Sequence, residues 1–179
     1  MPEIEIRTAI PEDTEALSSF EHGYYSDYAW QMGLDVSQDS AQVDFRRIRL
    51  PRRIFVAYPR SREEIFSTIN QNAEMLIAVL QGNPVGYIKT LQSRNSKVAR
   101  VLDLVVSSPM RRQGIGRALV LAMMDYLRHQ SYHTLMLQMQ SKNDPAIRMA
   151  EKLGFGFCGF QDHFFPNNEV AIFFSRIIR

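Results

Sequence analysis

The segment that decides the fold is Val105-Val106-Ser107-Ser108-Pro109-Met110-Arg111-Arg112-Gln113-Gly114-Ile115-Gly116-Arg117-Ala118-Leu119. An apolar strand ends in a glycine-containing turn, and that turn opens directly into a long helix. The first backbone N–H groups of a helix have no partner within it and lie at the positive end of the helix dipole. Gly114 and Gly116 let an anion approach the backbone closely, and Arg111, Arg112 and Arg117 add positive charge. The segment therefore predicts a diphosphate site.

The same glycines exclude two better-known nucleotide motifs. A Walker P-loop requires Gly-Lys followed by Ser or Thr, whereas Gly114 is followed by Ile115, Gly116 and Arg117. A dinucleotide fingerprint requires a third glycine where this chain has Leu119. A glycine loop without a ligand is the remaining alternative, and the flanking arginines argue against it.

Outward from this segment, the pattern predicts a mixed α/β sheet with helices on both faces. Apolar and β-branched runs between turn signals predict strands over residues 3–9, 75–80, 85–91, 99–106, 134–139, 155–160 and 170–176. Helices are predicted from Pro11, over 116–130, and from Asp144 to the stop at Gly154.

Residues 24–73 carry weaker signals. The aromatic side chains of residues 24–30 predict a second helix or an aromatic loop ending near Gly33. Residues 34–73 are predicted to be an insertion, because no Gly- or Ser-rich linker marks a domain boundary. The insertion contains a basic run (46–53), a short predicted strand (54–58) and a helix beginning at Ser61. The predicted buried face of that helix comprises Ile65, Phe66 and Ile69.

Composition predicts one ordinary globular domain over residues 1–179. Hydrophobic residues make up 45% and charged residues 22% of the 179, and the net charge is +2. This charge is too balanced to predict a nucleic-acid partner. The single cysteine, Cys158, permits no intramolecular disulfide, and neither a signal peptide nor a membrane span is predicted. A cytoplasmic location is therefore expected.

The sequence resembles the GNAT family of N-acetyltransferases. The family's acetyl-CoA signature, Gln/Arg-x-x-Gly-x-Gly/Ala, is matched by residues 111–116. The family follows this helix with a strand, Asn-x-x-Ala, and a helix closing in Gly-Phe. Here these are residues 135–139, residues 143–146 and Gly154-Phe155. The match covers residues 74–176 well and residues 3–33 loosely. The C-terminal part also resembles the streptothricin acetyltransferase type.

The resemblance implies a fold and a cofactor. The two central strands, about residues 99–106 and 134–139, would splay apart between flanking helices. The pantetheine arm of acetyl-CoA would lie in that gap and pair with the backbone of Leu104, Val105 and Val106. Asn143 would bond this arm or the adjacent loop. The diphosphate would lie on the loop of Arg111, Arg112, Gln113, Gly114, Ile115, Gly116 and Arg117.

The resemblance also implies a reaction: direct acetyl transfer from acetyl-CoA to a primary amine of a small molecule or peptide. No metal and no covalent enzyme intermediate are implied. The backbone N–H of Val106 would stabilise the tetrahedral oxyanion. A homodimer is compatible with the resemblance, whereas a membrane partner is not expected.

Two ionisable positions of the family are empty in this chain. Many members carry a tyrosine seven residues after the asparagine, where this chain has Ala150. The ribosomal-protein acetyltransferases carry a glutamate five residues before the asparagine, where this chain has Gln138. These departures leave open an alternative function, a weakly catalytic or inactive acyl-CoA-binding sensor or partner subunit.

The main candidate for the base is Asp103, because it interrupts an apolar strand and a buried charge is costly without a role. A structural aspartate, bonded to a nearby turn or paired with Arg100, is the alternative. Tyr87 is a second catalytic candidate, and His163 is a weaker one. Cys158 is expected to be a small buried hydrophobe. The aromatic residues 24–30 and the arginines of 46–53 are candidates for the acceptor side, with a solvated basic face as the alternative for the arginines.

Overall fold

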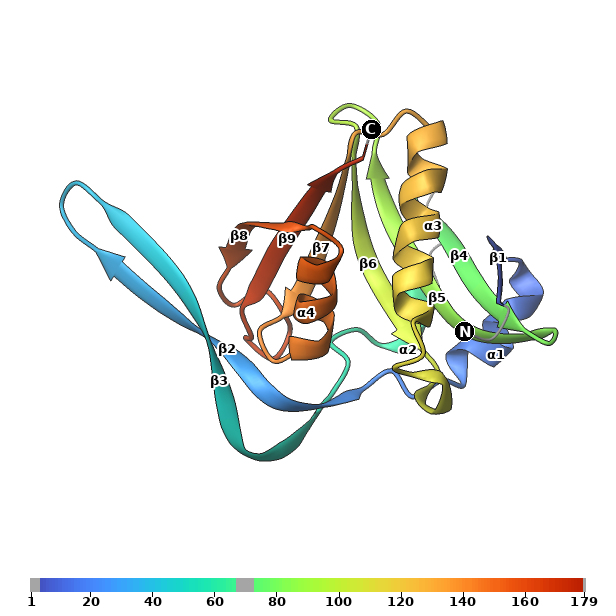
Figure 1. The fold of residues 1–179 in the computed structure, drawn as a ribbon, viewed down its shortest axis with the longest axis horizontal. Coiled ribbons are helices and arrows are strands. Elements are labelled where there is room, and N and C mark those ends of the chain that lie inside the picture. Colours follow the sequence, from blue (N-terminus) through green and yellow to red (C-terminus); the bar gives the residue numbers. More distant parts are fainter. Residues whose placement is uncertain (1–3, 67–72, 179) are drawn as a thin grey trace.

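The computed structural model describes residues 4–66 and 73–178. Within them a seven-stranded sheet has the order β1-β4-β5-β6-β7-β9-β8 (Figure 1). Its strands are β1 (Glu5–Thr8), β4 (Ala73–Leu80), β5 (Asn83–Ser93), β6 (Val98–Val106), β7 (Thr134–Gln140), β8 (Gly156–Gln161) and β9 (Ala171–Ile177). Only β6 and β7 pair in parallel, so the predicted mixed sheet is confirmed.

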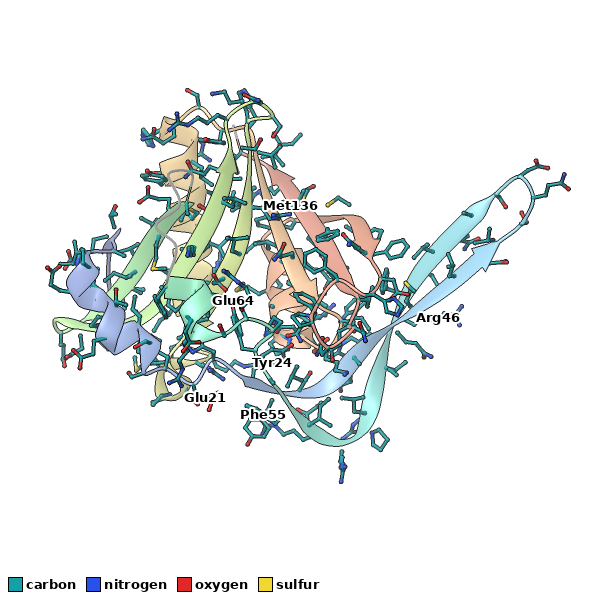
Figure 2. All side chains as sticks on the ribbon, turned by 180° about the vertical axis from the view of Figure 1, so that it is seen from behind. Glu21, Tyr24, Arg46, Phe55, Glu64 and Met136 are labelled. Atoms are coloured by element: carbon teal, nitrogen blue, oxygen red, sulfur yellow. The ribbon has the colours of Figure 1, made fainter. Side chains whose placement is uncertain are left out.

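Helices cover both faces of the sheet, as predicted. On one face, α3 (Ile115–His129) and α4 (Asp144–Lys152) pack on the larger hydrophobic core, which includes Leu76 and Ala78 of β4. On the other face, α1 (Thr14–Ser18) and α2 (Arg62–Phe66) cover a smaller core, which includes Ile77 and Val79. This alternation along β4 is the period-2 pattern of a strand buried on both faces. Figure 2 shows Glu64 on α2, on the face opposite α3.

In the first half of the chain, one prediction is wrong and a second is only partly confirmed. Residues 24–30 form neither a helix nor a loop but the start of β2 (Tyr24–Val36). The short strand expected at 54–58 is the end of β3 (Ala41–Val56), which pairs with β2 in a ribbon that projects from the sheet (Figure 1). The helix predicted after Ser61 is α2 and buries Ile65, whereas Ile69 lies outside the described residues.

The central strands β6 and β7 separate partway along their length, as the resemblance implied. Their register runs from Val98↔Thr134 to Val101↔Leu137 and then stops. Immediately beyond, Leu102 has no partner on β5, because Thr90 pairs with Val101 and Lys89 with Asp103. This extra residue is a β-bulge, which bends its strand and disrupts the ladder. The bulge therefore coincides with the opening of the sheet.

Two short 3-10 turns precede α1 and α3: Pro11–Asp13 and Ser108–Met110. No helix in the described part of the chain is long and apolar enough to cross a membrane.

Candidate active site

The predicted anion loop has the conformation that its glycines allow. Gly114, the N-cap of α3, has φ of 88°, in the left-handed region that favours glycine. Since glycine has no side chain, no side-chain cap bonds the N–H groups of the first turn of α3. Arg112 and Arg117 are exposed beside them, and neither forms an ion pair with another described residue. Free N–H groups and unpaired arginines together form an anion-binding surface.

A cleft of about 630 Å³ runs from this loop between α4 and β6. Its lining includes almost all of the predicted cofactor residues: Leu104, Val105, Val106, Arg111, Arg112, Gly114, Ile115, Gly116, Arg117 and Asn143. Gln113 does not line the cleft, and its amide nitrogen lies 3.3 Å from the Pro109 carbonyl oxygen. The structure thus brings the sequence-predicted residues together around one elongated cleft.

Arg111 has a different environment from the other two arginines. Its guanidinium donates to the carbonyl oxygens of Val106 (2.9 Å), Gly23 (2.9 Å) and Glu21. Burial lowers the pKa of Arg111. These bonds tie the end of β6 to the segment that precedes β2. In this structure the guanidinium of Arg111 therefore holds two segments of the cleft wall together, while Arg112 and Arg117 contribute positive charge to the cleft lining.

Backbone N–H groups of β6 face the gap in the sheet. Ser107 N–H donates to Val85 O at 2.9 Å, so odd-numbered residues at this end of β6 bond to β5. By the alternation of a strand, the N–H groups of Leu104 and Val106 point the other way, where β7 has already diverged. Both groups are placed as the resemblance implied for pantetheine pairing and for an oxyanion donor.

Asn143 lies at the opposite wall of the cleft as the N-cap of α4. Its side-chain oxygen accepts from Ala146 N–H at 3.3 Å, which is the bond expected of an N-cap asparagine. The next residue, Asp144, accepts from Arg47 Nε (2.7 Å) and Trp30 Nε1 (3.1 Å). These bonds fix the base of the β2–β3 ribbon against α4.

Asp103 is fully buried on the α1/α2 face of β6, with 0% of its side chain exposed. Tyr58 Oη donates to its Oδ1 at 2.9 Å, and Arg60 Nη1 pairs with its Oδ2. Burial raises the pKa of Asp103, against the opposing effects of Arg60, the Tyr58 hydrogen bond and Lys89. Arg100, the partner considered from the sequence, is not the partner found.

Comparison with known proteins decides the family. The sequence profile of the "Acetyltransferase (GNAT) family" matches residues 41–155, more than half of the chain. The chain belongs to the GNAT acetyltransferase family. A streptothricin acetyltransferase of Streptomyces lavendulae is 24% identical over 160 residues, covering 87% of this chain and 82% of that protein.

Two further relatives agree with the family. The ribosomal protein bS18-alanine N-acetyltransferase of Escherichia coli K12 is 31% identical over 71 residues, 40% of this chain and 48% of that protein. A candidate streptothricin acetyltransferase from Bacillus anthracis str. Ames, solved with acetyl coenzyme A, superimposes with a TM-score of 0.79 at 20% identity. That match covers 98% of this chain and 99% of the other, and it supports the GNAT fold.

Neither of the family positions noted above offers a proton-transfer group in this GNAT protein. Ala150 lies on the buried face of α4 and is fully enclosed in the core. Gln138 lines a cavity of about 80 Å³ between β6 and β7, and its buried side-chain oxygen has no hydrogen-bond partner. An amide cannot act as a base at neutral pH, so neither Gln138 nor Ala150 supplies a proton-transfer group.

Tyr87 is placed near the site but is itself enclosed, with 0% exposure. His22 Nδ1 lies 2.8 Å from the Phe20 carbonyl oxygen, which can only accept, so Nδ1 carries the proton and Nε2 accepts from Tyr87 Oη at 2.9 Å. Burial lowers the pKa of His22 and raises that of Tyr87. His22 lines the cleft, whereas Tyr87 supports it from behind.

Sequence reasoning missed three residues of this GNAT site: His22, Tyr58 and Arg60. They contribute to a third cavity, of about 230 Å³, which lies on the α1/α2 side and is also lined by Glu21, Phe55 and Arg62. Each belongs to a segment without regular sequence periodicity. Of the three, only His22 carried a signal in the sequence, because it lies just before the aromatic residues 24–30.

Two weaker sequence candidates lie at the surface. His163 is exposed in the turn after β8 and contacts Asp162, with its Nδ1 3.3 Å from the carboxylate. Cys158 is exposed, so the expectation of a buried cysteine is wrong. Cys158 lies in β8, one of the two edge strands of the sheet, at a bulge where the register with β9 shifts between Phe157 and Gly159.

Proposed function

We propose that this GNAT protein transfers the acetyl group of acetyl-CoA directly to a primary amine of a small molecule or peptide. The observation that carries the proposal is the continuity of the site. The cleft from the α3 loop and the cavity between β6 and β7 share Tyr58, Leu104, Asn143, Ala146 and Met149 in their linings. A thioester in the gap could therefore be reached from both faces of the sheet.

The residues present fit acetyl-CoA as the acyl donor. The uncapped first turn of α3, with Arg112 and Arg117, would hold the diphosphate. The N–H groups of Leu104 and Val106, which face the gap between β6 and β7, would pair with the amide groups of the pantetheine arm. The solved relative that contains acetyl coenzyme A has the same fold, which supports this assignment.

The proposed chemistry needs an oxyanion donor, a proton acceptor and no metal. Val106 N–H faces the gap and would donate to the oxygen of the tetrahedral intermediate. Asp103 would receive the proton of the attacking amine, since burial already raises its pKa. Tyr87 would act indirectly: its hydroxyl donates to Nε2 of His22 and so favours the neutral imidazole with its proton on Nδ1. No cluster of possible metal ligands occurs in the described residues.

The acceptor is proposed to approach from the α1/α2 face, through the cavity of His22, Tyr58 and Arg62. The ribbon forms the neighbouring wall: Tyr24 and Arg47 line the cleft, and the Arg47 guanidinium stacks 3.5 Å above the Tyr28 ring. Figure 2 shows Glu21, Tyr24 and Phe55 along this side of the molecule. A cytoplasmic location is part of this proposal, supported by the presence of only one cysteine.

Binding is tested by the Gly116→Val substitution. A Cβ at Gly116 would lie 3.6 Å from Met149 Sδ and 3.8 Å from Val106 Cγ2, which are ordinary van der Waals contacts. Gly114 is a poorer probe, because its φ of 88° would strain any replacement. Coenzyme A at 100 times its Kd should stabilise the wild type by about 2.7 kcal/mol. Because the valine fills cleft space, we expect Gly116→Val to lose most of this thermal shift.

Gly156→Ala is the control, because nothing lies within 4 Å of its Cβ and Gly156 does not line the cleft. It should keep the full shift. If Gly116→Val folds and responds to coenzyme A like the wild type, the cleft is not the cofactor site.

Activity is tested with acetyl-CoA and two amines named by the relatives, streptothricin and an alanine-initiated peptide. Acetylation of either one, at a rate above acetyl-CoA hydrolysis alone, is expected. The presence of Gln138 and Ala150 in place of ionisable residues favours an acyl-CoA sensor as the second candidate function. Tight coenzyme A binding without acetylation of any amine in a wider library would favour that sensor.

A further inference from the structure

Tyr58 lies where all three cavities of the site meet. It lines the cofactor cleft, the cavity between β6 and β7, and the cavity on the α1/α2 face. Among the described residues it is the only one that lines all three. If the acyl donor enters from one side and the acceptor from the other, the reacting atoms meet beside this side chain.

Asp103 has no surface of its own at this junction. Its side chain is 0% exposed and lines none of the three cavities. One of its oxygens is bonded to Tyr58 Oη at 2.9 Å and the other to Arg60. Tyr58 therefore lies both at the cleft and against the Asp103 carboxylate.

We propose that Tyr58 is the catalytic residue that exchanges protons with the reacting groups, and that Asp103 holds the proton behind it. This inference rests on the proposed acetyltransferase function. It assigns to one tyrosine, from the loop between β3 and α2, the proton transfers for which positions 138 and 150 offer no group.

The proton transfers balance without a further reactant. After the neutral amine attacks, its N–H bond breaks and an O–H bond forms at Tyr58 Oη. Simultaneously the original Oη–H bond breaks and an O–H bond forms at Asp103 Oδ1. When the C–S bond breaks, Tyr58 Oη gives a proton to the sulfur and regains one from Asp103. The products are the N-acetyl amine and coenzyme A thiol, with both residues restored.

The surrounding charges are compatible with this relay. Arg60 and Lys89 favour the ionised Asp103 that begins the cycle, while burial opposes it and raises its pKa. Burial and the Asp103 charge raise the pKa of Tyr58 well above its usual value, so the phenol remains protonated and able to donate. His22 lies 5.5 Å from the Tyr58 ring between centroids, and Tyr87 lies beyond it; burial holds His22 neutral.

The other tyrosines near the site are less suited. Tyr87 is fully enclosed and bonded to His22. Tyr24 lines the cleft, but its hydroxyl donates to Gln140 at 3.0 Å, and an amide cannot hold the proton. Of these three tyrosines, only Tyr58 combines access to the cleft with a carboxylate behind it.

The first test needs no acceptor: the thiol pKa of bound coenzyme A, followed by the ultraviolet absorbance of the thiolate. Loss of the donor in Tyr58→Phe should raise this pKa by about one unit, since a hydrogen bond to a charged group is lost. Fluorotyrosine at position 58 keeps the hydroxyl and the fold but is a stronger donor, so it should lower the pKa instead.

Tyr126→Phe is the control, because its hydroxyl also donates to a carboxylate, Glu74, at 2.9 Å, but outside the three cavities. It should leave the thiol pKa unchanged. If coenzyme A binds and neither substitution at position 58 moves the thiol pKa, the relay is wrong and the acetyltransferase proposal stands. If coenzyme A does not bind the wild type, both proposals fail.

The second test uses the amine acetylated best. Tyr58→Phe should lower kcat about 10²–10⁴-fold while coenzyme A affinity is kept. Because the two residues act as one unit, adding Asp103→Asn to Tyr58→Phe should cost little more than Tyr58→Phe alone. Losses that multiply in the double variant, or activity of Tyr58→Phe close to wild type, would overturn the relay.

Discussion

At the scale of single residues, the least expected feature is a neutral buried histidine in the site. His22 donates from Nδ1 to a backbone carbonyl and accepts at Nε2 from Tyr87. Protonating Nε2 would replace an acceptor with a second donor facing the Tyr87 hydroxyl. Burial also disfavours the charged imidazolium, and it lowers the pKa of His22 below its usual value of 6.5.

This arrangement predicts how stability changes with pH. An unfolded chain protonates His22 near pH 6.5, whereas the folded chain resists it. Neutral His22 therefore contributes fully to the free energy of unfolding above pH 6.5. This contribution is lost as the pH falls from 6.5 toward the lower pKa of the folded state, by at most about 1.4 kcal/mol per pH unit. His22→Gln should remove this slope in denaturant unfolding measured at several pH values.

His163→Gln is the control, since His163 is exposed and outside the three cavities. It should leave the slope attributed to His22 in place. A wild-type slope that survives in His22→Gln would show that another group titrates in this range.

The residues that the sequence did and did not identify differ in how local their signals are. Gly114 and the arginines beside it lie within one strand-turn-helix segment, so their geometry follows from chain order. Asp103 could be predicted as an anomaly because one charge interrupts an apolar strand. Its partners Tyr58 and Arg60 lie 45 and 43 residues away, and no local pattern specifies a contact over that distance.

At the scale of elements, the β2–β3 ribbon shows why residues 24–56 were misinterpreted. A strand is recognised when one face is buried and its side chains alternate. Beyond its base, this ribbon presents both faces to solvent: the consecutive residues Leu34, Asp35 and Val36, which point alternately to opposite faces, are all exposed. Without a buried face there is no alternation to read in residues 34–36. Nearer the base, the consecutive aromatic residues Tyr24 and Tyr25 point to opposite faces, so no apolar and polar alternation marks the strand there either.

The base of the ribbon is held by Asp144, and the chain's single tryptophan reports on that contact. Asp144 accepts from Trp30 and Arg47, and these bonds outweigh the effect of burial and keep its pKa below 3.8. The anchor is therefore intact at neutral pH and is lost only in acid, as the pH falls through that lowered value. Asp144→Asn should shift Trp30 emission to the red and increase its quenching by acrylamide.

Asp44→Asn offers a matched control, because Asp44 pairs with Arg46 at 2.8 Å farther out on the same ribbon. It should leave the emission unchanged. Equal spectra for Asp144→Asn and the wild type would mean that packing of Phe45 against Phe157 and Phe160 holds the ribbon without the ion pair.

At the scale of the whole molecule, the sheet consists of two halves with limited contact. One half comprises β1, β4, β5 and β6, and the other β7, β9 and β8. Four register pairs join them, from Val98↔Thr134 to Val101↔Leu137. Past Leu102 the N–H groups of β6 that face the gap have no strand to pair with, so the open end of the sheet is where a ligand can add to both halves.

Coenzyme A should therefore slow hydrogen exchange at the Leu104 and Val106 amides far more than global stabilisation requires. In the free protein these amides point into an open gap and have no hydrogen bond within the described part of the chain to protect them from exchange; in the complex they would pair with the pantetheine arm. Ala78, buried in β4, is the internal reference and should change only with global stability. Exchange measured with and without coenzyme A decides the point. If Leu104 and Val106 gain no more protection than Ala78, the ligand does not bridge the two halves of the sheet.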